Sequence, residues 1–159
     1  MGLAERDEKW MREALDEARL SAERGEVPVG AVVVCGEEIL GRGRDRREEL
    51  HDPSAHAEIL ALREAAARRG DWRLDDCDLY VTLEPCPMCA GAILLARIRS
   101  VCYALDNPKW GAVESKSRLL EPGLFNHTTV YRRSSDSCGQ SSRELLQSFF
   151  QEGRDPSEL

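Results

Sequence analysis

Two short segments carry the side chains best suited to chemistry. The first is His56-Ala57-Glu58, and the second is Pro85-Cys86-Pro87-Met88-Cys89. One histidine and two cysteines supply the nitrogen and sulfur ligands that Zn²⁺ favours. Three protein ligands leave one tetrahedral position open, which is typical of catalytic rather than structural zinc sites. A water molecule in that position can lose a proton near neutral pH and act as a nucleophile.

The expected positions of these residues on helices support one shared site. Cys86 and Cys89 are three residues apart at the predicted start of a helix, so both sulfurs can reach one metal ion. The positive end of that helix also favours the thiolate form. His56 falls in the first turn of another predicted helix, with Ser54 as its expected N-cap. Glu58 can share the site only if the pocket lies at that helix end, where it would carry protons to the leaving group.

Each motif alone is compatible with more than one kind of site. Cys-x-x-Cys is also half of a four-cysteine zinc ribbon, or a thioredoxin-like redox pair. The sequence has no second Cys-x-x-Cys, a redox pair has no use for His56, and a structural zinc site has no use for Glu58. His-x-Glu followed by Pro-Cys-x-x-Cys is the signature of zinc nucleobase deaminases, in which the glutamate is not a ligand. The two motifs together favour such a deaminase over a zinc-binding or redox module.

Length and composition indicate a single globular domain. The chain has 159 residues, close to the roughly 150 of an average domain, and 42% of them are apolar. The net charge of −7 excludes a cationic coat for nucleic acid but not a local basic patch. The longest apolar runs, 27–35 and 90–96, are too short for a membrane helix of about 20 residues. No secretory signal is visible at the N-terminus, so we expect a cytoplasmic protein without a membrane segment, its six cysteines free.

Hydrophobic periodicity places the elements that must position the two motifs. Apolar residues recur at helical spacing in some segments, and short β-branched runs between them are typical of strands. We expect helices over 5–25, 55–69, 87–96 and 141–150, strands over 29–35, 39–44, 79–83, 101–105 and 128–131, and a frayed polar tail over 151–159. Strands 29–35 and 39–44 form a hairpin, so the sheet is mixed. The alternation of helices and strands predicts an α/β fold with both faces of the sheet covered.

Several segments resemble the bacterial tRNA-specific adenosine deaminases, within the cytidine-deaminase-like superfamily. They are 27–32, 51–59, 80–92, Asn126-His127 and 145–150, and the likeness extends over about residues 5–151. The resemblance implies a three-layer α/β/α sandwich with a five-stranded mixed sheet. Residues 1–159 would form a single deaminase domain with a polar tail at 152–159.

The same resemblance implies an activity and its partners. Adenosine at the tRNA wobble position would be hydrolysed to inosine and ammonia by a homodimer with one Zn²⁺ per subunit. His56, Cys86 and Cys89 would be the metal ligands, and Glu58 would shuttle the protons. The tRNA anticodon loop would be the partner. The implied substrate contacts come from Val27, Pro28, Asp45, Ala57, Asn107, Lys109 and Phe149.

Three departures from the family pattern bear on the substrate, and one of them is Asn107, which stands where the family commonly has aspartate. Asp45 stands where the family has asparagine, and an ionised aspartate can only accept hydrogen bonds. The alternative function is therefore deamination of a free base or nucleoside, such as guanine or cytosine. The tail is also acidic, which weakens the case for phosphate contacts, although four arginines cluster at 42–47. Trp110 suits either base stacking or packing at a dimer interface.

Overall fold

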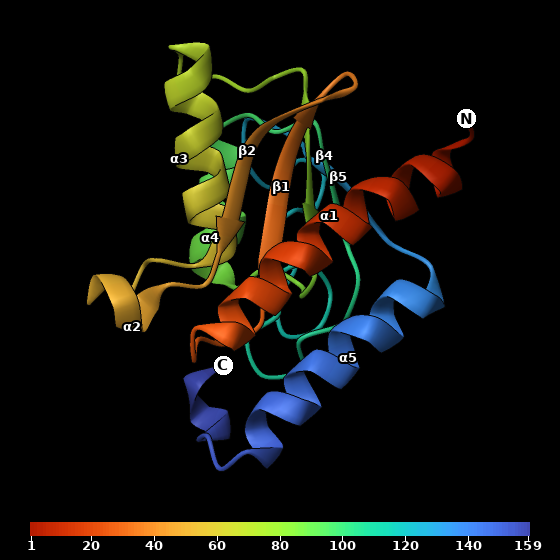
Figure 1. Ribbon diagram of the computed structural model, residues 1–159. Helices are drawn as coiled ribbons and strands as arrows, with labels where there is room; N and C mark the ends of the chain where they lie inside the picture. The colour runs from red at the N-terminus through yellow and green to blue at the C-terminus, as the bar shows by residue number, and fades with distance from the viewer.

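The computed structural model describes residues 1–159, the side chain of Glu158 excepted, and is built around one mixed five-stranded sheet (Figure 1). The strand order is β2-β1-β3-β4-β5. β1 is antiparallel to both β2 and β3, whereas β3, β4 and β5 are parallel. The strand bounds are β1 Gly30–Cys35, β2 Glu38–Arg44, β3 Cys77–Val81, β4 Ser100–Tyr103 and β5 Val130–Arg133. The predicted mixed sheet is confirmed.

Helices cover both faces of this sheet, which confirms the predicted three-layer sandwich. Figure 1 shows α1 (Leu3–Glu23) and α5 (Asp136–Gln151) on one face, and α3 (Ala57–Arg69) and α4 (Pro87–Leu95) on the other. Successive side chains of a strand point to opposite faces. Val32 and Val34 therefore pack towards α1, whereas Ala31 and Val33 join the core beneath α3 and α4. This double burial explains why the β1 sequence is apolar throughout.

Two glycines let α3 approach the sheet closely. A Cβ atom on Gly43 of β2 would lie 2.0 Å from the carbonyl oxygen of Ala57, and one on Gly41 would lie 2.2 Å from that of Ala61. The facing side of α3 carries the small residues Ala57, Ala61 and Ala65, all fully buried. This contact sets the depth of the N-terminal end of α3, where His56 and Glu58 lie.

Most predicted elements are confirmed, but four local expectations are wrong. Ser54 is not the N-cap of α3, because its N–H and hydroxyl both donate to Asp52 and the helix begins after His56. A short helix, α2 (Arg47–Leu50), lies between the expected strand 39–44 and the expected helix 55–69, where no helix is predicted. α5 begins at Asp136, since its first turn is polar and gives no apolar periodicity. The tail is not simply frayed, because Pro156–Glu158 forms a 3₁₀ helix.

Two further expectations concern cysteines and membranes. All six cysteines are free thiols, as expected. Among the residues that the structure describes, no helix combines the length and the apolar character needed to cross a membrane.

Candidate active site

The N-terminal ends of α3 and α4 bring the histidine and the two cysteines together. His56 and Cys86 occupy the N-cap positions of the two helices, and Cys89 lies in the first turn of α4. Pro87 at the first position of α4 loses no helical hydrogen bond there. The Nδ1 atom of His56 is 3.6 Å from Cys86 Sγ and 3.5 Å from Cys89 Sγ. All three donor atoms lie within 4.8 Å of one another, which makes this group able to hold a metal ion.

The electrostatics of the group favour a metal-binding thiolate. The hydrogen bond with Cys89, aided by that with His56, lowers the pKa of the Cys86 thiol to about 4 despite its burial. The same bond with Cys86, together with burial, raises the pKa of Cys89. Burial alone would lower the pKa of His56, but Cys86 and Glu58 raise it. One thiolate, one further thiol and one imidazole form a donor set that fits Zn²⁺.

Glu58 lies next to this group, in the first turn of α3. It is only 4% exposed. Burial raises the pKa of its carboxyl group to about 7. A carboxyl group with such a pKa can both accept and donate a proton near neutral pH, as general acid–base catalysis requires. Burial therefore gives Glu58 the property that its position beside the ligands would use.

A second buried carboxylate, Glu84, anchors the loop that follows β4. Its oxygens accept hydrogen bonds from the backbone N–H groups of Asn107, Val113, Glu114 and Ser115, and from the Ser115 hydroxyl. Burial alone would raise the pKa of Glu84, but these hydrogen bonds lower it. A Cβ atom on Gly111 would lie 2.4 Å from Glu84 Cδ, so the loop also needs glycine there. Glu84 thereby fixes the position of Asn107.

A cavity opens at this end of the sheet, beside the metal-ligand group. Its lining consists of Val27, Val29, Asp45, Arg47, His56, Ala57, Glu58, Leu83, Glu84, Cys86, Asn107 and Leu159. Four of the seven substrate contacts expected from the family resemblance are therefore at the cavity, namely Val27, Asp45, Ala57 and Asn107.

The structure places the other three away from this lining. Pro28 is buried between two lining residues. Lys109 is exposed, and its ammonium group donates to the carbonyl oxygen of Pro156. Phe149 is 3% exposed and belongs to the core, where it meets Phe150 edge to face with ring centroids 5.2 Å apart.

Sequence reasoning missed five lining residues, which are Val29, Arg47, Leu83, Glu84 and Leu159. Glu84 gave a usable signal, because it is an acidic residue between an apolar strand and Pro85. Arg47 gave only a weak one, as part of a basic run. Its Nε atom donates to both carboxylate oxygens of Asp45, at 3.2 and 3.0 Å. Leu159 gave none, since nothing in a polar tail indicates that it folds back to the cavity.

The four clustered arginines are paired with acidic side chains. Arg42 contacts Glu13 and Glu17, Arg44 and Arg46 contact Glu49, and Arg47 contacts Asp45. These pairs reduce the positive charge that the cluster presents.

Comparisons with known proteins agree on one family. Residues 5–154 match the model of the MafB19-like deaminases. A tRNA-specific adenosine deaminase of Agrobacterium fabrum is 47% identical over 146 residues, which cover 91% of this chain and 94% of the relative. A tRNA-specific adenosine deaminase of Bacillus subtilis is 43% identical over 150 residues, which cover 93% of this chain and 91% of the relative. A solved structure from work on A-to-I editing by tRNA:A34 deaminases aligns with a TM-score of 0.82 and 44% identity, over 87% of this chain and 99% of that chain.

The mixed sheet, the His/Cys/Cys group and the buried glutamate beside it define a hydrolytic deaminase of the cytidine-deaminase-like fold. The similarity to relatives spans nearly the whole chain, not only these motifs. The chain belongs to the MafB19-like deaminase family, and within it to the tRNA-specific adenosine deaminases. The family expected from the sequence is thereby confirmed.

Proposed function

We propose that the protein is a zinc-dependent hydrolase that converts adenosine to inosine at the wobble position of tRNA. The observation that carries the proposal is the group of His56, Cys86 and Cys89 beside a cavity that the buried Glu58 lines together with His56 and Cys86. The relatives named tRNA-specific adenosine deaminases supply the substrate class.

One zinc ion per subunit would be held by His56, Cys86 and Cys89. When bound, zinc supplies a Lewis acid that activates a water molecule at neutral pH. The protein supplies the remaining chemistry. The carboxylate of Glu58 accepts a proton from the attacking water, and then donates a proton to the amino group that leaves as ammonia. Its burial keeps bulk water away from this transfer.

We infer that Asp45 and Asn107, which line the cavity, orient the base. Asp45 is paired with Arg47 and offers acceptors only. Asn107 Oδ1 accepts from the N–H groups of Lys109 and Trp110, at 3.3 and 3.1 Å, which leaves its amide group to act as a donor. The same loop carries the exposed Lys109 and a 55% exposed Trp110. These two suit a phosphate contact and base stacking in an anticodon loop.

Ammonia release tests the proposal. The zinc-loaded protein is compared on an anticodon stem-loop with wobble adenosine, on the same stem-loop with wobble guanosine, and on free adenine, guanine, cytosine and their nucleosides. We expect turnover on the adenosine stem-loop alone, and none with Glu58→Ala. Turnover on a free base alone would contradict the proposal and support the alternative function. Asp45→Asn then tests base selection, which must change if Asp45 contacts the base.

We further propose that the enzyme is a homodimer in the cytoplasm, where a tRNA substrate is found. α4 exposes Met88 and Leu95 at 39% and 70%, and Leu95 lines an apolar surface groove with Trp72. Sedimentation should give a dimer that Leu95→Glu dissociates. The matched control is Leu124→Glu, at a 51% exposed leucine outside that groove. A monomeric wild-type protein would contradict the assembly.

A further inference from the structure

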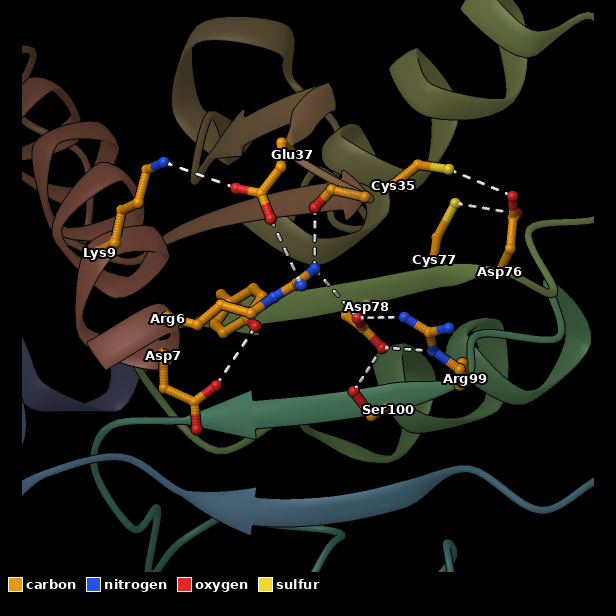
Figure 2. Close-up of polar contacts among 12 residues, drawn as sticks. Arg6, Asp7, Lys9, Cys35, Glu37, Asp76, Cys77, Asp78, Arg99 and Ser100 are labelled. Carbon is orange, nitrogen blue, oxygen red and sulfur yellow. Dashed lines mark hydrogen bonds and ion pairs between the residues drawn. The ribbon is translucent and has the colours of Figure 1, made fainter. Parts of the chain in front are cut away.

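A second pair of cysteines lies at the other end of α3, on neighbouring strands. Cys35 ends β1 and Cys77 begins β3, and the two residues are directly opposite in the antiparallel register. Figure 2 shows both side chains extending to the same side of the strands, towards Asp76. The Sγ atoms and an Asp76 carboxylate oxygen lie within 4.8 Å of one another.

The backbone around this pair suits a covalent bond. The Cys77 N–H donates to Leu74 at 3.0 Å, and its carbonyl accepts from Arg99 at 2.9 Å. Cys35 and Cys77 are therefore a non-hydrogen-bonded antiparallel pair, for which the Cα atoms are about 4.5 Å apart. Disulfides span Cα separations of about 4.4–6.8 Å. No change of strand pairing is needed to join the two sulfurs.

The two thiols differ in access and reactivity. Cys35 is partly exposed, and the Arg69 guanidinium donates to its Sγ atom at 3.3 Å. The same Sγ atom donates to the Asp76 carboxylate at 3.2 Å. Cys77 is fully buried, and burial raises the pKa of its thiol to about 12. An external disulfide therefore reacts first with Cys35, and the buried Cys77 can react only with the adduct formed on Cys35.

We propose that Cys35 and Cys77 are an oxidisable dithiol, a modification site for low-molecular-weight disulfides such as glutathione disulfide. The Cys35 sulfur attacks one glutathione sulfur, and the other glutathione leaves with the proton as a thiol. The Cys77 sulfur then attacks Cys35, its proton passes to the second glutathione, and that glutathione leaves. Two protein thiols are oxidised to one disulfide, and glutathione disulfide is reduced to two thiols. This site is independent of the deaminase reaction.

The same geometry favours a disulfide over a bound metal. Arg69 donates to both Asp76 and Cys35, so a guanidinium charge already lies against two of the three potential ligands. A divalent cation would have to displace it against charge repulsion. The disulfide needs no such displacement. It would close a chain segment that contains β2, α2 and α3, and would therefore raise the unfolding temperature by constraining the unfolded chain.

Mass mapping of the full-length, zinc-loaded protein tests the proposal. The protein is incubated with glutathione disulfide, its remaining thiols are alkylated, and it is digested with chymotrypsin without reduction. Cleavage after Tyr80 separates Cys77 from Cys86 and Cys89. We expect a cross-linked Cys35–Cys77 peptide and a higher unfolding temperature. In Cys77→Ser the reaction should end at a glutathione adduct on Cys35. Cys102→Ser, a change at another buried cysteine, should form the same cross-link as the wild type.

Two results would overturn the proposal. One is a wild-type protein that keeps glutathione on Cys35 without forming the bond to Cys77. The other is a second equivalent of zinc that is bound by the wild type and lost in Cys77→Ser, which would make the group a metal site. The first reading comes from the wild-type protein alone, so misfolding of a variant cannot hide it.

Discussion

The cysteines near the N-terminal end of α3 are grouped with His56, and Cys86 lines the cavity there, whereas near the C-terminal end of α3 the Arg69 guanidinium donates to Cys35. The two groups are separated by the length of a 13-residue helix, about 20 Å. Each contains two thiols and one further polar ligand. Their surroundings assign them different chemistry.

Backbone setting accounts for much of the difference. Cys86 and Cys89 are on the first turn of a helix, where spacing brings both sulfurs to one point and the positive helix end favours a thiolate. Cys35 and Cys77 are opposite one another on two paired strands, and both sulfurs lie beside Asp76. At the first group, a histidine nitrogen offers a third potential metal ligand. At the second, an arginine supplies a charge that opposes a metal. Residue type alone therefore does not distinguish a metal site from a dithiol.

The largest expected effect comes from Glu58→Gln, which removes proton transfer at the proposed active site and leaves the Cys35–Cys77 group unchanged. Glutamine keeps the size of the side chain but cannot carry the proton. Ammonia release from the stem-loop should fall by about 10²–10⁴-fold, with zinc content unchanged. Glu64→Gln, on an exposed position of the same helix, is the matched control and should retain activity. A Glu58→Gln enzyme with nearly full turnover would remove Glu58 from the mechanism.

Gly43→Ala should have the second-largest effect, because it disturbs the close packing of β2 against the N-terminal end of α3. The added Cβ would lie 2.0 Å from the Ala57 carbonyl oxygen, so the helix must move away from β2. We expect a loss of about 1–3 kcal/mol in the free energy of unfolding, measured in urea, and reduced turnover. Gly91→Ala, where nothing lies within 4 Å of the added atom, should cost no stability. Equal behaviour of the two variants would show that close packing does not position His56.

Asp78→Asn probes the opposite end of β3, next to Cys77. Burial alone would raise the pKa of Asp78, but hydrogen bonds from Arg99 and Ser100 lower it from 3.8. An acid whose pKa is lowered by folding stabilises the protein above its unfolded pKa, and this contribution is lost as pH falls through the folded value. The variant should lose about 1–2 kcal/mol near pH 7, with little change in turnover. The difference from wild type should shrink below pH 3.8 in acid unfolding curves. A constant difference across pH would contradict this assignment.

Cys77→Ser should have the smallest effect on turnover. Comparing it with Cys86→Ser separates the role of the second cysteine pair from that of the proposed metal ligands. In the reduced protein, turnover on the stem-loop should change by less than about twofold, because the two groups are well separated. Cys86→Ser is the comparison variant and should lose zinc and activity together. Loss of activity in reduced Cys77→Ser that retains its zinc would show that the two ends are coupled.

Much of the molecule was predictable because local pattern and residue type carry it. Short β-branched apolar runs indicated the strands, and apolar residues at helical spacing indicated the main helices. His56, Glu58, Cys86 and Cys89 were recognisable from their spacing. Element ends were less predictable where side chains decide them. Asp52 captures Ser54 and shifts the start of α3, and the polar first turn of α5 has no apolar periodicity. Phe149 could not be assigned from sequence, because core and pocket phenylalanines have the same local pattern.

The sequence by itself determined the groups that we propose for the chemistry, since metal binding and proton transfer depend on residue type and short spacing. Tertiary structure alone decided which residues meet them. Arg47 pairs with Asp45 at the cavity, Glu84 gathers the loop around Asn107, and Leu159 returns to the same cavity. It also placed Cys35 opposite Cys77, 42 positions apart in the chain. Such contacts depend on strand register and helix packing between distant segments, which no local pattern encodes.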